Sequence, residues 1–142
     1  MRVVIVYLFI FLVSCKSVNQ VVAEVGNNTD VQVNYRLHDI WALNTIDSID
    51  AGRDRSNAYL EFNLTTDKIY GNTGCNSLSG DLIVKADSLR MFNIAVSEML
   101  CIRFQNEQEY ISSLEQPMSY SIEGLELTLK SKQTTFTFRK VD

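Results

Sequence analysis

Residues 123–139 read EGLELTLKSKQTTFTFR, and this stretch decides the fold class because apolar and polar side chains alternate along it. Leucines occupy every second position from 125 to 129, and Phe136 and Phe138 resume the period after a short polar break. A period of two gives a strand one buried and one wet face, which is typical of antiparallel sheets. The stretch predicts two antiparallel strands, and Glu123-Gly124 predicts a tight hairpin from a preceding strand.

The same alternation is found upstream. Leu60, Phe62 and Leu64 alternate with Glu61 and Asn63, which predicts another half-buried strand. Shorter strands are predicted at residues 40–43, 69–73, 82–85, 89–92 and 119–122. Turn-forming residues separate the strands at 65–68, 71–80 and 130–133.

One segment has a helical period instead. Asn106 precedes acidic residues, as at a capped helix start. Tyr110, Ile111 and Leu114 then share one face, and Pro117 ends the segment. One helix of about three turns among about eight strands predicts a single α+β domain, in which a curved antiparallel sheet covers the helix.

The N-terminus is typical of a secretion signal. Arg2 precedes an apolar run of 11 residues, 3–13, which is shorter than the ~20 that span a membrane. Leu12-Val13-Ser14-Cys15 resembles the lipobox of bacterial lipoproteins, so we expect residues 1–14 to be cleaved and Cys15 to carry acyl chains that anchor it durably. The alternative is an ordinary signal peptide with an incidental cysteine.

Residues 15–35 are expected to form a lipid-anchored, flexible tether, because residues 26–30 (GNNTD) are typical of linkers. Lys16 has no acidic run after it, which favours an outer-membrane lipoprotein that faces the periplasm. The domain itself is expected over residues 36–142.

Charge excludes one class of partner. Removing the first 14 of the 142 residues leaves 128, with a net charge of −5 because Arg2 is lost. The basic residues are scattered rather than clustered into the footprint that phosphate binding requires. We therefore expect no nucleic-acid partner, and a monomer whose membrane contact is the lipid on Cys15.

Two cysteines remain beside Cys15. Cys75 and Cys101 form an even pair in an oxidising compartment, so we expect a disulfide, with two buried free thiols as the alternative. The loop closed would hold 27 residues, worth about 3.5 kcal/mol. His38 is the sole histidine, and two sulfurs beside it do not complete a zinc shell.

No catalytic residue, metal or cofactor is predicted. His38 is the sole candidate base, and no G-x-S-x-G elbow accompanies the serines. The acidic residues of the helix start are explained by the helix dipole. Residues 71–80 lack the Gly-Lys-Ser/Thr of a phosphate loop, so we expect Asn72, Gly74 and Asn76 to supply positive φ around a tight turn.

Two tripeptides, Asp47-Ser48-Ile49 and Asp87-Ser88-Leu89, resemble sites that are O-glycosylated in some bacteria of the Bacteroides group. Matches of three residues are common by chance.

Several short motifs follow one another in a family-specific order. They are Trp41-x-Leu43, Leu60-Glu61-Phe62, the block GNTGCN at 71–76, SEMLC at 97–101, Glu107-x-x-Tyr110-Ile111-x-x-Leu114 and Gly124-x-x-Leu127-x-Leu129. In this order and spacing, residues 37–140 resemble the META domain, or HslJ-like, family. Ser97 and Glu98 depart from the Thr and basic residue that usually precede Met-x-Cys there, and a common proline before Leu60 is absent.

The resemblance implies a strongly bent antiparallel sheet, close to a half-open barrel, around one helix. It also implies a small envelope lipoprotein linked to stress, without an established enzymatic activity. We therefore expect a non-enzymatic accessory or binding module at the outer membrane. The alternative is a binder of apolar ligands or lipid tails, or a pilot-like secretion accessory, that uses the groove between helix and sheet.

Overall fold

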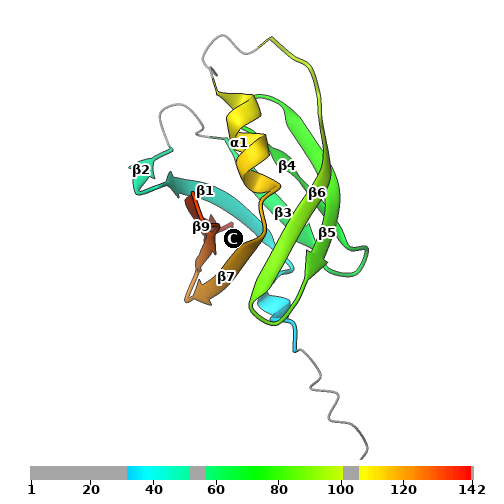
Figure 1. Ribbon diagram of the computed structural model, residues 1–142, viewed down its shortest axis with the longest axis vertical. Coiled ribbons are helices and arrows are strands. Elements are labelled where there is room, and N and C mark those ends of the chain that lie inside the picture. Colours follow the sequence, from blue (N-terminus) through cyan, green and yellow to red (C-terminus); the bar gives the residue numbers. More distant parts are fainter. Residues whose placement is uncertain (1–31, 52–56, 101–105, 142) are drawn as a thin grey trace, which may run out of the picture.

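The computed structural model describes residues 32–51, 57–100 and 106–141 (Figure 1). The predicted signal peptide, Cys15 and Cys101 lie outside these residues. In chain order the elements are η1 (Tyr35–Leu37), β1 (Ile40–Ile46), β2 (Ile49–Asp50), β3 (Tyr59–Asn63), β4 (Lys68–Asn72), β5 (Ser77–Val84), β6 (Ser88–Val96), α1 (Glu107–Leu114), β7 (Met118–Glu123), β8 (Glu126–Lys130) and β9 (Thr135–Lys140).

The strands form one antiparallel sheet that closes on itself. Each strand from β3 to β8 pairs with the next, β1 pairs with β3, and β9 returns to pair with β1. The result is an eight-stranded barrel, with β2 as a short addition to β1. The α+β prediction is confirmed, whereas the predicted half-open barrel differs from the closed ring. Closure leaves β1 and β9 without the open edges that a bent sheet would expose.

The ring is uneven around its circumference. Five residue pairs join β1 to β9, and the Thr45 and Thr137 hydroxyl oxygens lie 2.7 Å apart across this seam. Only Ser88–Ser119 and Leu89–Met118 pair β6 with β7. The barrel is therefore tightly closed at one seam and splayed at another.

Helix α1 lies at the end of the barrel opposite to η1, between β6 on one side and the β1–β2 hairpin on the other (Figure 1). Past its C-terminal end, the Glu115 carboxylate accepts a hydrogen bond from the Ile94 N–H at 3.3 Å. This bond satisfies a backbone donor on the stretch of β6 that β7 does not pair. The helix thus covers the splayed end of the barrel.

The predicted helical face is confirmed, because Tyr110, Ile111 and Leu114 are buried. The helix has eight residues, or just over two turns, rather than three, and Asn106 occupies the N-cap position without a side-chain capping bond. The Tyr110 ring meets Phe136 edge to face, with centroids 5.9 Å apart and an interplanar angle of 80°. This contact ties the helix to β9.

Apolar side chains from the strands fill the interior of the barrel. Those with less than 2% exposure are Trp41, Leu60, Phe62, Ile69, Met91, Leu127, Leu129, Phe136 and Phe138. The Trp41 indole N–H donates to the Leu37 carbonyl at 3.1 Å, so this buried polar group is satisfied. The alternation read from the sequence correctly identified the inward positions of β3, β8 and β9.

Two turn predictions need correction. The hairpin between β7 and β8 turns on Gly124 and Leu125, not on Glu123-Gly124, because Glu123 still pairs with Glu126. Gly124 takes φ +57°, and Leu125 is 55% exposed rather than buried. Glycine adopts this left-handed conformation at little steric cost because it has no Cβ, so the turn begins at Gly124.

Residues 71–76 also differ from expectation. Of the three residues expected at positive φ, only Gly74 adopts it, at +105°. Asn72 instead accepts the Gly74 N–H at 2.7 Å, which is an Asx turn. Gly71 is required for a different reason, since a Cβ there would lie 2.2 Å from the Tyr59 carbonyl oxygen on β3.

Candidate functional site

One side of α1 is held by a buried polar network. Thr73 and Asn76, which follow β4, are 0% and 2% exposed. The Glu107 carboxylate accepts hydrogen bonds from the Thr73 hydroxyl and from the Asn76 amide, the latter at 2.9 Å. Buried polar groups are costly unless paired, and here both find partners on α1. The network therefore fixes the first turn of the helix to the GNTGCN block.

Asn76 also positions the segment that leads away from β6. Its side-chain oxygen Oδ1 accepts hydrogen bonds from the Met99 N–H at 2.8 Å and from the Ser97 hydroxyl at 2.9 Å. Its amide group donates to the Met99 carbonyl at 3.4 Å. Asn76 thus binds the backbone of residue 99 much as a neighbouring strand would. These contacts join the GNTGCN and SEMLC segments in the structure.

Cys75 lies within this network, between Thr73 and Asn76. Its sulfur is disulfide-bonded. Because Cys101 lies outside the described residues, the pairing of Cys75 with Cys101 stays a prediction, as does lipidation of Cys15.

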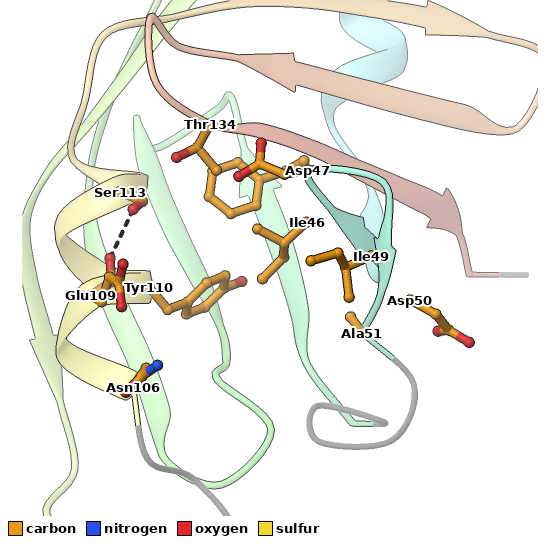
Figure 2. A pocket seen from close by; sticks show the side chains of 11 residues that line it. Ile46, Asp47, Ile49, Asp50, Ala51, Asn106, Glu109, Tyr110, Ser113 and Thr134 are labelled. Atoms are coloured by element: carbon orange, nitrogen blue, oxygen red, sulfur yellow. Dashed lines mark hydrogen bonds between the residues drawn. The ribbon is translucent and has the colours of Figure 1, made fainter.

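The other side of α1 borders a pocket of about 350 Å³ (Figure 2). Its wall residues come from the end of β1, the β1–β2 turn, β2, α1 and the start of β9. They are Ile46, Asp47, Ile49, Asp50, Ala51, Asn106, Glu109, Tyr110, Ser113, Thr134 and Phe136. Figure 2 shows the Tyr110 ring extending from the helix toward Ile46. The pocket is therefore walled by three separate parts of the fold.

The pocket combines an apolar floor with an acidic rim. Ala51, Tyr110 and Phe136 are buried, and Ile46 is half-buried. Asp47, in the β1–β2 turn, and Glu109, on the helix, both line the pocket and are exposed. None of the described lining residues is basic.

The β1–β2 turn is fixed at both of its residues. Asp47 and Ser48 take φ +49° and +68°, as a two-residue type I′ hairpin requires. The Asp47 carboxylate accepts the Thr135 N–H at 2.7 Å, and the Asp47 N–H donates to the Thr135 carbonyl at 2.8 Å. The hairpin is thereby attached to β9, and the wall of the pocket keeps its place.

Two ion pairs shift carboxylate pKa values elsewhere on the barrel. The hydrogen bond from Lys140, 2.6 Å away, lowers the pKa of Asp39 and links the start of β1 to the end of β9. A hydrogen bond from Lys68 lowers the pKa of Asp81, assisted by the Asn93 amide, and the same pair raises the pKa of Lys68. Both pairs are partly exposed to solvent, and none of their residues lines the pocket.

The remaining candidates from the sequence are scattered. His38 is the C-cap of η1, at the opposite end of the barrel from α1 (Figure 1). Ser48 is exposed in the β1–β2 turn, whereas Ser88 is half-buried at the start of β6. Within residues 32–51, 57–100 and 106–141, no group of three His, Cys, Asp or Glu residues could hold a metal ion. In the same residues, no helix is both long and apolar enough to cross a bilayer.

From the sequence, a groove between helix and sheet was predicted only as the alternative site, without its lining residues, and the role of Glu107 was not predicted. The helix-dipole explanation accounted for the acidic helix start and hid its contact with Asn76, 31 residues away. The signal that could have revealed this contact was Asn76, the asparagine that ends the family-specific GNTGCN motif.

A sequence model of the META domain matches residues 32–142. The chain belongs to the META domain family. The match begins within the segment expected to be tether, and there Asn34 accepts the Arg36 N–H and so caps η1. As a META domain, the chain has the fold of a small accessory or binding domain.

Solved structures share the fold at low sequence identity. A protein solved by NMR is 22% identical, with a TM-score of 0.61, over 77% of this chain and 96% of its own. An NMR structure from Burkholderia xenovorans is 19% identical, with a TM-score of 0.59, over 75% and 85%. A DUF4847 family protein from Bacteroides vulgatus is 11% identical, with a TM-score of 0.54, over 75% and 96%. No curated protein matches the chain significantly.

Proposed function

We propose that this META domain is a non-enzymatic binding module of the bacterial envelope, anchored by lipid on Cys15, that takes a small ligand in the pocket beside α1. The observation that carries the proposal is the pocket itself. About 350 Å³ is within the size range of small-ligand sites, and these are commonly apolar with a few polar groups. An accessory role in envelope stress is part of the proposal and rests on the family.

The construction of the pocket supports a binding role. Binding sites keep their geometry when they are built on rigid elements. Here one wall is a helix fixed by Glu107, and the other is a hairpin fixed to β9 through Asp47. A ligand would therefore meet preformed walls, which lowers the entropy lost on binding.

The arrangement of reactive groups disfavours catalysis. Hydrolysis by a serine needs a base within hydrogen-bond reach of the nucleophile. The sole histidine is at the η1 end of the barrel, whereas Ser113 and Ser48 belong to the α1 end (Figure 1). The Ser113 hydroxyl donates to the Glu109 backbone carbonyl, as expected for a helix serine in a structural role.

The anchor is tested by substitution. We expect Cys15→Ala to abolish labelling by a palmitate analogue and to prevent normal signal cleavage, because the acylated thiol is removed. Cys75→Ala is the matched control and should label as the wild type does. Efficient labelling of the Cys15→Ala protein would refute the lipid anchor.

The pocket is tested by a screen of small apolar fragments against residues 32–142, the part of the chain that matches the META domain. Binding is observed by NMR through the chemical shifts of the backbone amides. Bound fragments should shift the amides of Ile46, Ala51 and Tyr110 together. Ser113→Phe should abolish these shifts by filling the pocket from the helix, while Gln108→Phe on the exposed face should not. A screen that moves none of these amides at millimolar concentrations would refute binding at this pocket.

A carrier of lipid tails is the second candidate, because the pocket floor is apolar. The acidic rim opposes the carboxylate of a fatty acid, and the barrel interior is already filled by side chains. We therefore expect long-chain fatty acids to leave the melting temperature unchanged. A saturable rise at micromolar concentrations would favour the carrier instead.

A further inference from the structure

We infer that the pocket beside α1 selects a small amphipathic cation, namely a primary amine on a short aliphatic chain. This inference rests on the proposed binding function and names the chemical class of the ligand. It starts from charge complementarity. The apolar floor would hold an aliphatic chain, and the rim carries carboxylates without a basic residue among the described lining residues.

The two carboxylates that matter are Asp47 and Glu109. They come from two different walls of the pocket, the β1–β2 turn and the helix, so that an ammonium group at the mouth would lie in the negative potential of both. Asp50 also lines the pocket, but Figure 2 shows its carboxylate directed away from the helix, and it has an interaction of its own. Asp47 uses one oxygen to accept the Thr135 N–H, which leaves the other for a ligand.

The floor favours a short aliphatic chain. Ile46, Ala51 and Tyr110 present aliphatic carbon and an aromatic ring, and among the described lining residues only Asp47, Asp50 and Glu109 are charged. A volume of about 350 Å³ lies near the lower end of the range of small-ligand sites. An amine with a short chain, such as one of about six carbons, suits a site of this size better than a long membrane lipid tail. The hydroxyl groups of Ser113 and Thr134 also line the pocket and can accept hydrogen bonds from an ammonium group.

The geometry also predicts which compounds are rejected. A carboxylate in place of the amine would be repelled by the same rim, and an alcohol would gain no charge interaction. Exposed carboxylates remain hydrated, so that the discrimination is modest and falls as salt is added. For a ligand of so few atoms we expect a dissociation constant on the order of 1 mM.

The test is a titration of the soluble domain with n-hexylamine, n-hexanol and hexanoate at pH 7, followed by amide shifts. We expect saturable shifts at Ile46, Ala51 and Tyr110 with hexylamine. The dissociation constant should be at least tenfold higher for hexanoate and severalfold higher for hexanol. Raising NaCl from 0.05 to 0.5 M should reduce the advantage of the amine to about half or less.

Charge-neutral variants locate the selectivity. Glu109→Gln and Asp47→Asn each keep the side-chain shape, and asparagine tolerates the positive φ of the turn. Each should weaken hexylamine binding about threefold and leave hexanol unchanged. Glu126→Gln, an exposed change on β8, is the matched control and should alter neither. Equal weakening by all three substitutions would overturn the inference.

The outcomes separate this inference from the proposed function. If hexanol or hexanoate shifts the pocket amides as strongly as hexylamine, the pocket binds ligands but does not select cations, and only the inference fails. If none of the three shifts these amides and the fragment screen is also negative, both fail. Hexylamine shifts that are confined to other surfaces would also refute the inference.

Discussion

The two sides of helix α1 are built differently. Toward the loop after β4, Glu107 bonds to buried Thr73 and Asn76, and this side is closed. Toward the β1–β2 hairpin, the helix leaves a pocket, and the side chains at the rim are exposed. The difference shows how a helix of eight residues acts as a fixed joint on one side, so that its other side can serve as the wall of a binding site.

The largest loss of stability is expected at Leu114, because both sides of the helix depend on the contact of this side chain with the barrel. Leu114 is 0% exposed and holds the helix on the barrel. Leu114→Ala should lower the free energy of unfolding by about 2–5 kcal/mol, because it leaves a cavity. Urea denaturation measures the loss, and Gln108→Ala on the exposed face should stay within about 0.5 kcal/mol. Equal stability of the two variants would show that the helix is only loosely attached.

The disulfide sharpens the comparison, since Cys75 belongs to the closed side only. If Cys75 pairs with Cys101, replacing both by Ser should cost about 3.5 kcal/mol by the loop-entropy estimate. Both thiols should resist alkylation in freshly isolated protein and react after reduction. Free thiols in the unreduced protein would contradict the pairing. Binding of small ligands at the pocket should be little changed at temperatures where the variant remains folded.

The polar network gives the direct contrast between the two sides. Asn76→Ala should destabilise the domain by about 1–3 kcal/mol, because Glu107 and the Met99 backbone lose buried partners. On the pocket side, Glu109→Gln should change stability by less than about 0.5 kcal/mol, since this carboxylate is exposed. Thermal melts of the two variants measure the difference. Similar losses of stability in the two variants would contradict the structural difference between the two sides of the helix.

The smallest effect is expected at the opposite end of the barrel, where Lys140 lowers the pKa of Asp39. A carboxyl group whose pKa is lower in the folded state stabilises the fold above its unfolded pKa of about 3.9. That stabilisation is lost as the pH falls through the folded value. Asp39→Asn should therefore cost less than about 1 kcal/mol at pH 7 and nothing near pH 2. Urea midpoints of the wild type and the variant at both pH values test this direction. A larger destabilisation by Asp39→Asn near pH 2 than at pH 7 would contradict it.

The sequence predicted the parts of this structure that depend on local periodicity. Inward positions on β3, β8 and β9 followed from the alternation around Phe62, Leu127 and Phe138, and the helix face followed from Tyr110 and Leu114. The lengths of β5 and β6 were underestimated, because Gly80 and Asn93 interrupt the pattern where the register shifts. Such irregularities follow from pairing with neighbours and are not visible in one strand alone.

The site was harder to predict for the same reason. The pocket brings together residues near 46–51, 106–113 and 134–136, and no motif spans these segments. Closure of the barrel depends on the pairing of β1 with β9, which an alternating pattern does not specify. The GNTGCN block was recognised by resemblance, yet its expected role in a turn with positive φ applied only to Gly74.

The pairing of β1 with β9 has a consequence for the order in which the chain folds. Thr45 and Thr137, which touch across this seam, are separated by 92 positions in the sequence. Contacts of such long separation slow folding, since a long loop must be closed before they form. β9, which completes the ring, follows all the other described strands in the chain, so that the seam between β1 and β9 cannot form until nearly the whole domain has been synthesised. A chain shortened before residue 135 would lack β9 and, with it, the pairing that closes the barrel.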